Sequence, residues 1–136
     1  MRKMLGIAAV LAAFVAGDAA AEGLTKEEYK AGRQRIAQEY QAARQRCGSS
    51  LGNNTDVCVA QARAAQKIAT AELDAAYKPS PRANHKAALA RVDADYSVAK
   101  QKCDVEKADA HERCMKRAAT ARDQARAEAK TAAQAR

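Results

Sequence analysis

The strongest constraint in this sequence is an internal repeat. A shift of 56 residues brings the two halves of residues 30–132 into register without a gap. Each half holds two cysteines separated by ten residues, Cys47 with Cys58 and Cys103 with Cys114, and a tyrosine stands seven residues before each first cysteine. Alanine matches arise easily in an alanine-rich chain, but matched cysteine pairs and tyrosines do not. The chain is therefore expected to fold as two copies of one unit.

Within each copy, small and apolar residues recur at alternating spacings of four and three, which is the pattern of a helix with one packed side. The first stretch of each copy carries this seam as Tyr29, Arg33, Ile36, Tyr40, Ala43 and Cys47, and as His85, Leu89, Val92, Tyr96, Ala99 and Cys103. The second stretches, beginning at Cys58 and Cys114, have seams made almost entirely of alanine. Each copy is predicted to be an antiparallel pair of helices.

Turn residues support this prediction more strongly in the first copy than in the second. Residues 48–54 contain two glycines and two asparagines, which adopt turn conformations at low cost. The second copy has no glycine between Cys103 and Cys114, so one continuous helix from Asn84 to Lys130 is the alternative there.

Two prolines, Pro79 and Pro81, separate the copies, because proline lacks the backbone donor that a helix interior needs. The predicted fold class is all-α, with two tandem antiparallel helical hairpins and four helices. Repeat 1 covers residues 22–78, the Pro-rich linker covers 79–81, and repeat 2 covers 82–136.

The four cysteines are expected to form structural disulfides, one closing each hairpin. Cys47 and Cys103 each end the first seam of a copy, and Cys58 and Cys114 each begin the second, so the two members of a pair face each other. Each bridge closes a loop of about 12 residues, for which the loop-entropy model gives about 3 kcal/mol. Four cysteines also allow two pairings between the copies, and both stay open at this stage.

The N-terminus has the three parts of a secretory signal peptide over residues 1–21. Two basic residues precede an apolar run over residues 5–16, and small residues follow at 19–21, so cleavage is expected between Ala21 and Glu22. The alternative is an uncleaved anchor. The run spans only about 18 Å as a helix, against a hydrocarbon core of about 30 Å, so no stable membrane insertion is expected after cleavage. The expected location is the periplasm, or the medium beyond it, where disulfides form.

Charge bears on the kind of partner. Without residues 1–21, the chain has 22 Lys and Arg against 15 Asp and Glu. Such a field attracts anionic envelope polymers. No nucleic acid is expected as a partner, because export takes the chain away from the chromosome and aromatic residues for stacking are scarce. Envelope proteins are the other expected partners, and the oligomeric state stays open.

We expect no enzyme, no cofactor and no metal site. The adjacent carboxylates Glu27 and Glu28, and the nearby pair Asp93 and Asp95, come with no partnered nucleophile. A cluster of soft ligands occurs once, as Cys103, His111, Cys114 and Met115, and it lacks a counterpart in the first copy. Metal or redox handling by this cluster is one alternative function, and it requires free thiols. A periplasmic stress chaperone is another, and it requires an exposed apolar concavity.

Three segments carry a resemblance to known proteins: residues 24–30 (LTKEEYK), 54–60 (NTDVCVA) and 76–81 (AYKPSP). With the signal peptide, they resemble a group of small exported Ala- and Lys-rich helical proteins of β-proteobacteria, which carry the label cell envelope biogenesis protein TolA-like. The resemblance covers nearly the whole chain after residue 21 and implies a helical envelope protein. It carries over no catalytic residue. The expected function is thus a non-enzymatic envelope protein that acts by binding.

Overall fold

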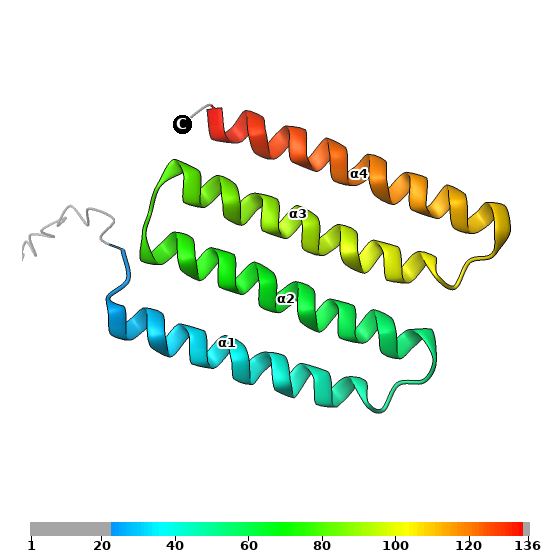
Figure 1. The fold of residues 1–136 in the computed structure, drawn as a ribbon, viewed down its shortest axis with the longest axis horizontal. Coiled ribbons are helices and arrows are strands. Elements are labelled where there is room, and N and C mark those ends of the chain that lie inside the picture. The colour runs from blue at the N-terminus through cyan, green and yellow to red at the C-terminus, as the bar shows by residue number, and fades with distance from the viewer. Residues whose placement is uncertain (1–22, 135–136) are drawn as a thin grey trace, which may run out of the picture.

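The computed structural model describes residues 23–134, so the predicted signal peptide, 1–21, and its cleavage site between Ala21 and Glu22 lie outside the described part. The described chain is all-α, with no strand, and has four helices. Consecutive helices are antiparallel (Figure 1), which confirms the two predicted hairpins. The helices are α1 (Lys26–Cys47), α2 (Asn53–Tyr77), α3 (Pro81–Cys103) and α4 (Ala108–Gln134).

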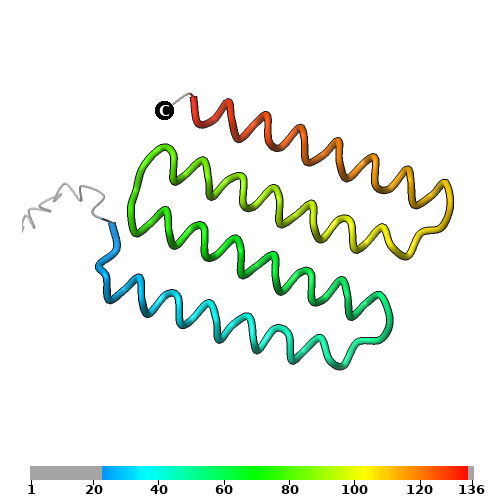
Figure 2. Tube along the Cα trace, viewed as in Figure 1, coloured from blue at the N-terminus to red at the C-terminus, as the bar shows by residue number. Residues whose placement is uncertain are grey.

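The four helices form a single layer. In the described residues each helix packs only against its neighbours in the sequence, α1 on α2, α2 on α3 and α3 on α4. Figures 1 and 2 show the four lying side by side in chain order. The inner helix α2 is consequently buried on two sides: Ala62 and Ala64, which point in opposite directions, are 6% and 8% exposed. The outer helix α4 has no buried residue.

The packing of α1 on α2 differs from the predicted seam at one turn. Arg33 is exposed, and Gly32 beside it is buried. A Cβ on Gly32 would lie only 2.7 Å from Cδ1 of Leu73, so glycine is what lets this leucine pack against the α1 backbone. The seam therefore runs through Gly32, because glycine removes the side chain that would otherwise separate the helices.

The two hairpin turns share one unusual backbone position. Gly52, the residue before α2, has a φ of 58°, and Ala108, which stands exactly one repeat later, has a φ of 47°. Left-handed backbone is easy for glycine and strained for alanine. The second turn forms nonetheless, so the alternative of a continuous helix over residues 84–130 is wrong: α3 ends at Cys103 and α4 begins at Ala108.

The connection between the hairpins, residues 78–80, is as long as the linker predicted at 79–81 but lies one residue earlier. Helix α2 ends at Tyr77 and α3 already begins at Pro81. Proline is favoured in the first turn of a helix, where its missing N–H needs no partner. Ser80 caps this helix, since its Oγ accepts a hydrogen bond from the Ala83 N–H at 3.0 Å. The prolines thus start a helix as well as separate two.

The hairpins also pack against each other, through the side of α2 that faces α3. Ala64 and Ala75 of α2 and Ala94 of α3 are buried there. The side-chain amide of Asn53 donates to the Gln101 carbonyl at 3.3 Å. The two repeats therefore form one continuous layer and are not two units on a string.

At the two outer edges of the layer, on α1 and α4, polar residues replace the small or apolar residues of the α2–α3 interface. The replacement is seen when each edge residue is compared with its equivalent in the other repeat. On α4 the equivalents of Val57, Ala60, Ala64 and Ile68 are Arg113, Lys116, Thr120 and Gln124. On α1 the equivalents of Ala90, Ala94 and Ser97 are Gln34, Gln38 and Gln41. All seven of these edge residues are exposed. Terminal repeats of solenoid proteins have polar outer sides in the same way, so α1 and α4 form the polar edges of this layer.

Candidate functional surfaces

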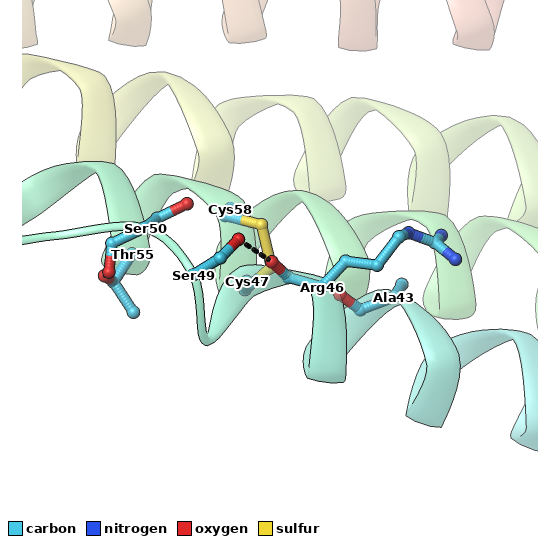
Figure 3. Close-up of a disulfide and its surroundings, with 7 residues drawn as sticks. All are labelled: Ala43, Arg46, Cys47, Ser49, Ser50, Thr55 and Cys58. Atoms are coloured by element: carbon cyan, nitrogen blue, oxygen red, sulfur yellow. Dashed lines mark hydrogen bonds between the residues drawn. A yellow bond between two sulfur atoms is a disulfide. The ribbon is translucent and has the colours of Figure 1, made fainter.

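The cysteines lie where each hairpin turns. Cys47 is bonded to Cys58 and Cys103 to Cys114, with Cα–Cα distances of 5.5 and 5.6 Å. Cys47 and Cys103 are each only 1% exposed. Figure 3 shows the first bridge beneath the turn, where the Ser49 hydroxyl donates to the Arg46 carbonyl at 2.9 Å. Of the three pairings open to four cysteines, the structure has the one that closes each hairpin.

The soft-ligand cluster of the second copy is divided between bonded sulfurs and an ion pair. Cys103 and Cys114 are bonded to each other, so neither supplies the thiolate that zinc or copper prefers. His111 Nε2 lies 3.5 Å from an Asp104 carboxylate oxygen. Among residues 23–134 no group of three or more His, Cys, Asp or Glu side chains is placed to hold a metal ion. Metal or redox handling here would require reduction of the disulfide first.

Two of the four carboxylates that stood out in the sequence, Glu28 and Asp93, have structural partners. The Glu28 carboxylate accepts the Thr25 N–H at 2.8 Å and the Thr25 hydroxyl at 2.9 Å, in a capping box at the start of α1. The backbone hydrogen bond, then the hydroxyl, lowers the pKa of Glu28. Asp93 pairs with Arg126 of α4 at 2.5 Å. The Glu28 carboxylate thus caps α1, and the Asp93 carboxylate links α3 to α4.

A groove runs between α3 and α4 on one face of the layer. Its volume is about 620 Å³. Small side chains form most of its floor, and Val92 and Tyr96 supply the larger apolar surface. Two cations flank the ring of Tyr96, with the Arg122 guanidinium 4.5 Å and the Lys100 ammonium 5.1 Å from its centroid. Arg122 Nε donates to Asp123 at 2.8 Å, and this contact raises the pKa of the guanidinium. The alanines that line the groove between α3 and α4 are Ala88, Ala99, Ala118, Ala121, Ala125, Ala129 and Ala132.

The first copy has the same groove in a more filled form. A groove of about 310 Å³ lies between α1 and α2. Ile36, Tyr40 and Ala65 line it, and their equivalents one repeat later, Val92, Tyr96 and Ala121, line the larger groove. Because the repeats follow one another in a single layer, both grooves open on the same side, which we call the groove face. A third hollow, of about 450 Å³, lies between α2 and α3 and shares Ala88 and Arg91 with the largest groove.

Three substitutions between the copies explain the difference in filling. The equivalents of Leu73 and Tyr77 are Ala129 and Ala133, and the equivalent of Tyr29 is His85. In the first copy Tyr29 stacks on Tyr77, with ring centroids 4.3 Å apart, and its hydroxyl donates to Asp74 at 2.8 Å. In the second copy the His85 ring nitrogen lies 3.2 Å from the Ala129 carbonyl, beside a hollow of about 100 Å³. The end of the second hairpin is therefore more open.

The charges on the groove face are balanced. Three arginines line the hollows between neighbouring helices, Arg46, Arg91 and Arg122, against four carboxylates, Glu39, Glu72, Asp95 and Glu128. A further hollow of about 410 Å³ on the outer side of α4 shares Ala121 with the largest groove and is lined by Arg113, Lys116 and Arg117. Arg91 and Glu72 form an ion pair across the α2–α3 interface. Residues 23–134 contain 21 Lys and Arg and 14 Asp and Glu. The excess of positive charge must therefore lie elsewhere on the molecule.

The opposite side of the layer, which we call the basic face, holds much of this excess. A residue two positions before a groove residue lies about 200° round the helix, and so on the other face. By this geometry Arg63, Lys86 and Arg126 oppose Ala65, Ala88 and Glu128. Following each stripe at spacings of three and four gives twelve basic residues against six acidic ones, Asp56, Asp74, Asp93, Asp109, Glu112 and Asp123. The basic residues are Lys26, Lys30, Arg33, Arg44, Arg63, Lys67, Arg82, Lys86, Lys100, Lys116, Arg126 and Lys130.

Within residues 23–134 no helix is both long enough and apolar enough to cross a bilayer. Sequence reasoning located the cysteines but missed both faces. The signal was present, because the groove and basic stripes alternate along each helix, yet it becomes visible only once the helices are known to form one layer. Comparison with family models, with curated proteins and with solved structures finds no match to this chain.

Proposed function

We propose that this protein is a non-enzymatic binding protein of the cell envelope, and that it binds anionic polymers, such as the phosphate-bearing lipopolysaccharide, through its basic face. The observation that carries the proposal is the separation of charge between the two faces of a single layer. Twelve basic residues on one face, eleven of them exposed, present a flat array to a partner of opposite charge. The balanced groove face offers no such attraction.

The location rests on two features. The disulfides agree with an oxidising compartment, since thiols stay reduced in the cytosol. The first 21 residues have the pattern of a signal peptide, which we take to direct export to the periplasm. Mass spectrometry of the protein from a periplasmic extract, without reduction, tests this. We expect a chain that begins at Glu22 and holds two disulfides, and a chain that keeps residues 1–21 would contradict it.

Four substitutions, one on each helix, test the binding face: Lys30→Gln, Lys67→Gln, Lys86→Gln and Lys130→Gln in one variant. A basic side chain near an anionic surface contributes about 1 kcal/mol, so affinity for lipopolysaccharide should fall roughly a hundredfold or more at low salt. Binding is measured by titration calorimetry with purified lipopolysaccharide, at several salt concentrations. The affinity of the unmodified chain should weaken as salt rises.

A matched control separates this face from net charge. The control variant also loses four positive charges, but at positions on the edges, on the groove side and in a turn. Its substitutions are Arg35→Gln, Lys102→Gln, Lys107→Gln and Arg113→Gln. We expect the control variant to keep its affinity within about threefold, since its charges are farther from the bound surface. Equal losses in both variants, or binding that ignores salt, would refute a basic binding face. Circular dichroism checks that both variants stay helical.

A further inference from the structure

We propose that the groove face is a self-association surface, on which a second copy of this chain docks face to face to make a double layer of eight helices. This inference goes beyond the proposed function and does not depend on the anionic polymer. The first observation that supports it is the number of helix layers. Folded domains are normally built of two or more packed layers around an apolar core, and this chain supplies one layer.

Of the two faces and two edges of the layer, the groove face has the charge pattern that best suits a second copy. The basic face would meet another basic face with strong repulsion, because like charges in contact oppose association. The outer edges of α1 and α4 carry glutamines and basic residues at the positions where α2 and α3 pack on each other. On the groove face, in contrast, three arginines and four carboxylates are interspersed among alanines. A surface with both signs in near balance can be complementary to itself.

The duplicated grooves fit a symmetric dimer. In a two-fold interface the same patch is used by both partners, so each groove of one copy meets a groove of the other. Residues 65 and 121, both exposed alanines, stand at the same repeat position on the rims of the two grooves. The hollow end of the second hairpin, where Ala129 and Ala133 replace larger residues, leaves room for side chains from a partner.

The groove face is also large enough for a stable dimer interface. A helix of 25 residues, such as α2, is about 38 Å long, and four helices at 8–10 Å spacing make a face about 35 Å wide. The face therefore measures on the order of 1,300 Å². A standard stable interface buries about 800 Å² on each partner, so docking over two thirds of this face suffices.

The experiment is sedimentation equilibrium of the chain beginning at Glu22, with both disulfides intact and without added polymer, from 1 to 100 µM. We expect a reversible shift to twice the monomer mass within this range. The variant Ala65→Glu with Ala121→Glu places a buried carboxylate in each groove of the dimer, so its dimer dissociation constant should rise at least a hundredfold. The control, Ala37→Glu with Ala127→Glu, adds the same charge at exposed positions two residues before the groove residues Glu39 and Ala129, away from the groove face, and should change the constant less than threefold.

Every outcome decides the proposal. A wild-type chain that stays monomeric at 100 µM overturns it, and so does a control pair that disrupts the dimer as strongly as the groove pair. If the groove variant loses helicity, the concentration dependence of the wild-type mass decides alone. A monomer that instead prevents the aggregation of an unfolded protein would assign the grooves to client binding. Loss of lipopolysaccharide binding leaves this test unaffected.

Discussion

At the scale of single residues, the two turns show one requirement met in two ways. Gly52 and Ala108 occupy the same repeat position and have φ values of 58° and 47°. The turn needs left-handed backbone there, because the chain must reverse within the few residues between the two bonded cysteines. Glycine adopts this conformation freely, whereas alanine is strained by contact of its Cβ with the backbone. The second turn therefore forms against local preference.

Exchanging these residues should change stability in opposite directions. Gly52→Ala introduces left-handed strain and should lower the free energy of unfolding by about 1–2 kcal/mol. Ala108→Gly relieves the same strain and should raise it by up to about 1 kcal/mol, after the entropy lost on fixing glycine. Gly48→Ala is the control for backbone conformation, because Gly48 has a φ of −63°; its Cβ would lie 3.2 Å from the Gln45 carbonyl oxygen, so it should cost less than Gly52→Ala. Urea unfolding measures all three, and a neutral Gly52→Ala would show that the turn can adopt another conformation.

A second residue effect depends on pH. The hydrogen bond from Tyr29 to the Asp74 carboxylate raises the pKa of this tyrosine above its ordinary value, and burial acts in the same direction. As pH rises, the Tyr29 hydroxyl loses its proton in the unfolded chain before it does so in the folded chain. The stabilisation by its hydrogen bond is therefore complete below about pH 10 and is lost as pH rises through the folded pKa of Tyr29. The urea midpoint of the wild type should exceed that of Tyr29→Phe below pH 10, and the two should converge above it.

Tyr40→Phe is the matched control for this measurement, since it removes a hydroxyl from the same helix without touching Asp74. Its difference from the wild type should not follow the same pH course. A gap between wild type and Tyr29→Phe that does not narrow as pH rises above the ordinary pKa of tyrosine would contradict the assigned hydrogen bond.

At the scale of the helices, the two hairpins share a plan but differ in how well their interfaces are filled. Leu73 packs into the space left by Gly32 in the first copy, and two alanines, Ala88 and Ala129, take these positions in the second. Either pair brings the helices together, but the leucine buries more apolar surface. The first hairpin is thus more filled by side chains, and the second keeps the larger groove.

A double-mutant cycle tests this exchange. Gly32→Ala places a Cβ 2.7 Å from Leu73 and should destabilise the chain by about 1–3 kcal/mol, as overpacking does. Leu73→Ala should cost about 2–3 kcal/mol. The double variant reproduces the alanine pair of the second copy, so it should be more stable than the sum of the single changes by about 1 kcal/mol or more. Thermal and urea unfolding measure the coupling, and strict additivity would show that the two residues do not compete for the same space.

Helix positions and disulfides were predictable because they depend on patterns within one copy. The cysteine spacing, the tyrosines and the prolines all act locally, and their repetition made the hairpin and its bridge recognisable. The packing of α2 on α3 was not predicted, because the search for a seam considered one side of each helix. Comparing the copies position by position would have revealed it: Val57, Ala64 and Ile68 of α2, which packs on both α1 and α3, become Arg113, Thr120 and Gln124 of α4, which packs on α3 alone among the described helices.

At the scale of the whole molecule, a single layer makes every surface accessible and gives each a different character. Two polar edges end the array, one face is strongly basic, and the other is balanced and grooved. The faces could not be predicted from net charge alone, because the overall excess of Lys and Arg does not show on which side of a helix the residues lie. If copies dock groove to groove as proposed, the basic faces point away from each other, and one dimer then presents two binding surfaces in opposite directions.

The disulfides have a mechanical consequence. Both bridges lie at the end of the layer where the hairpins turn, whereas the first and last described residues lie at the opposite end (Figure 1). If the two ends of the chain were pulled apart, each hairpin would open from its free end like a zipper and stop at its cysteines. Tension would then pass from sulfur to sulfur, and the turns beyond the bridges would bear no load.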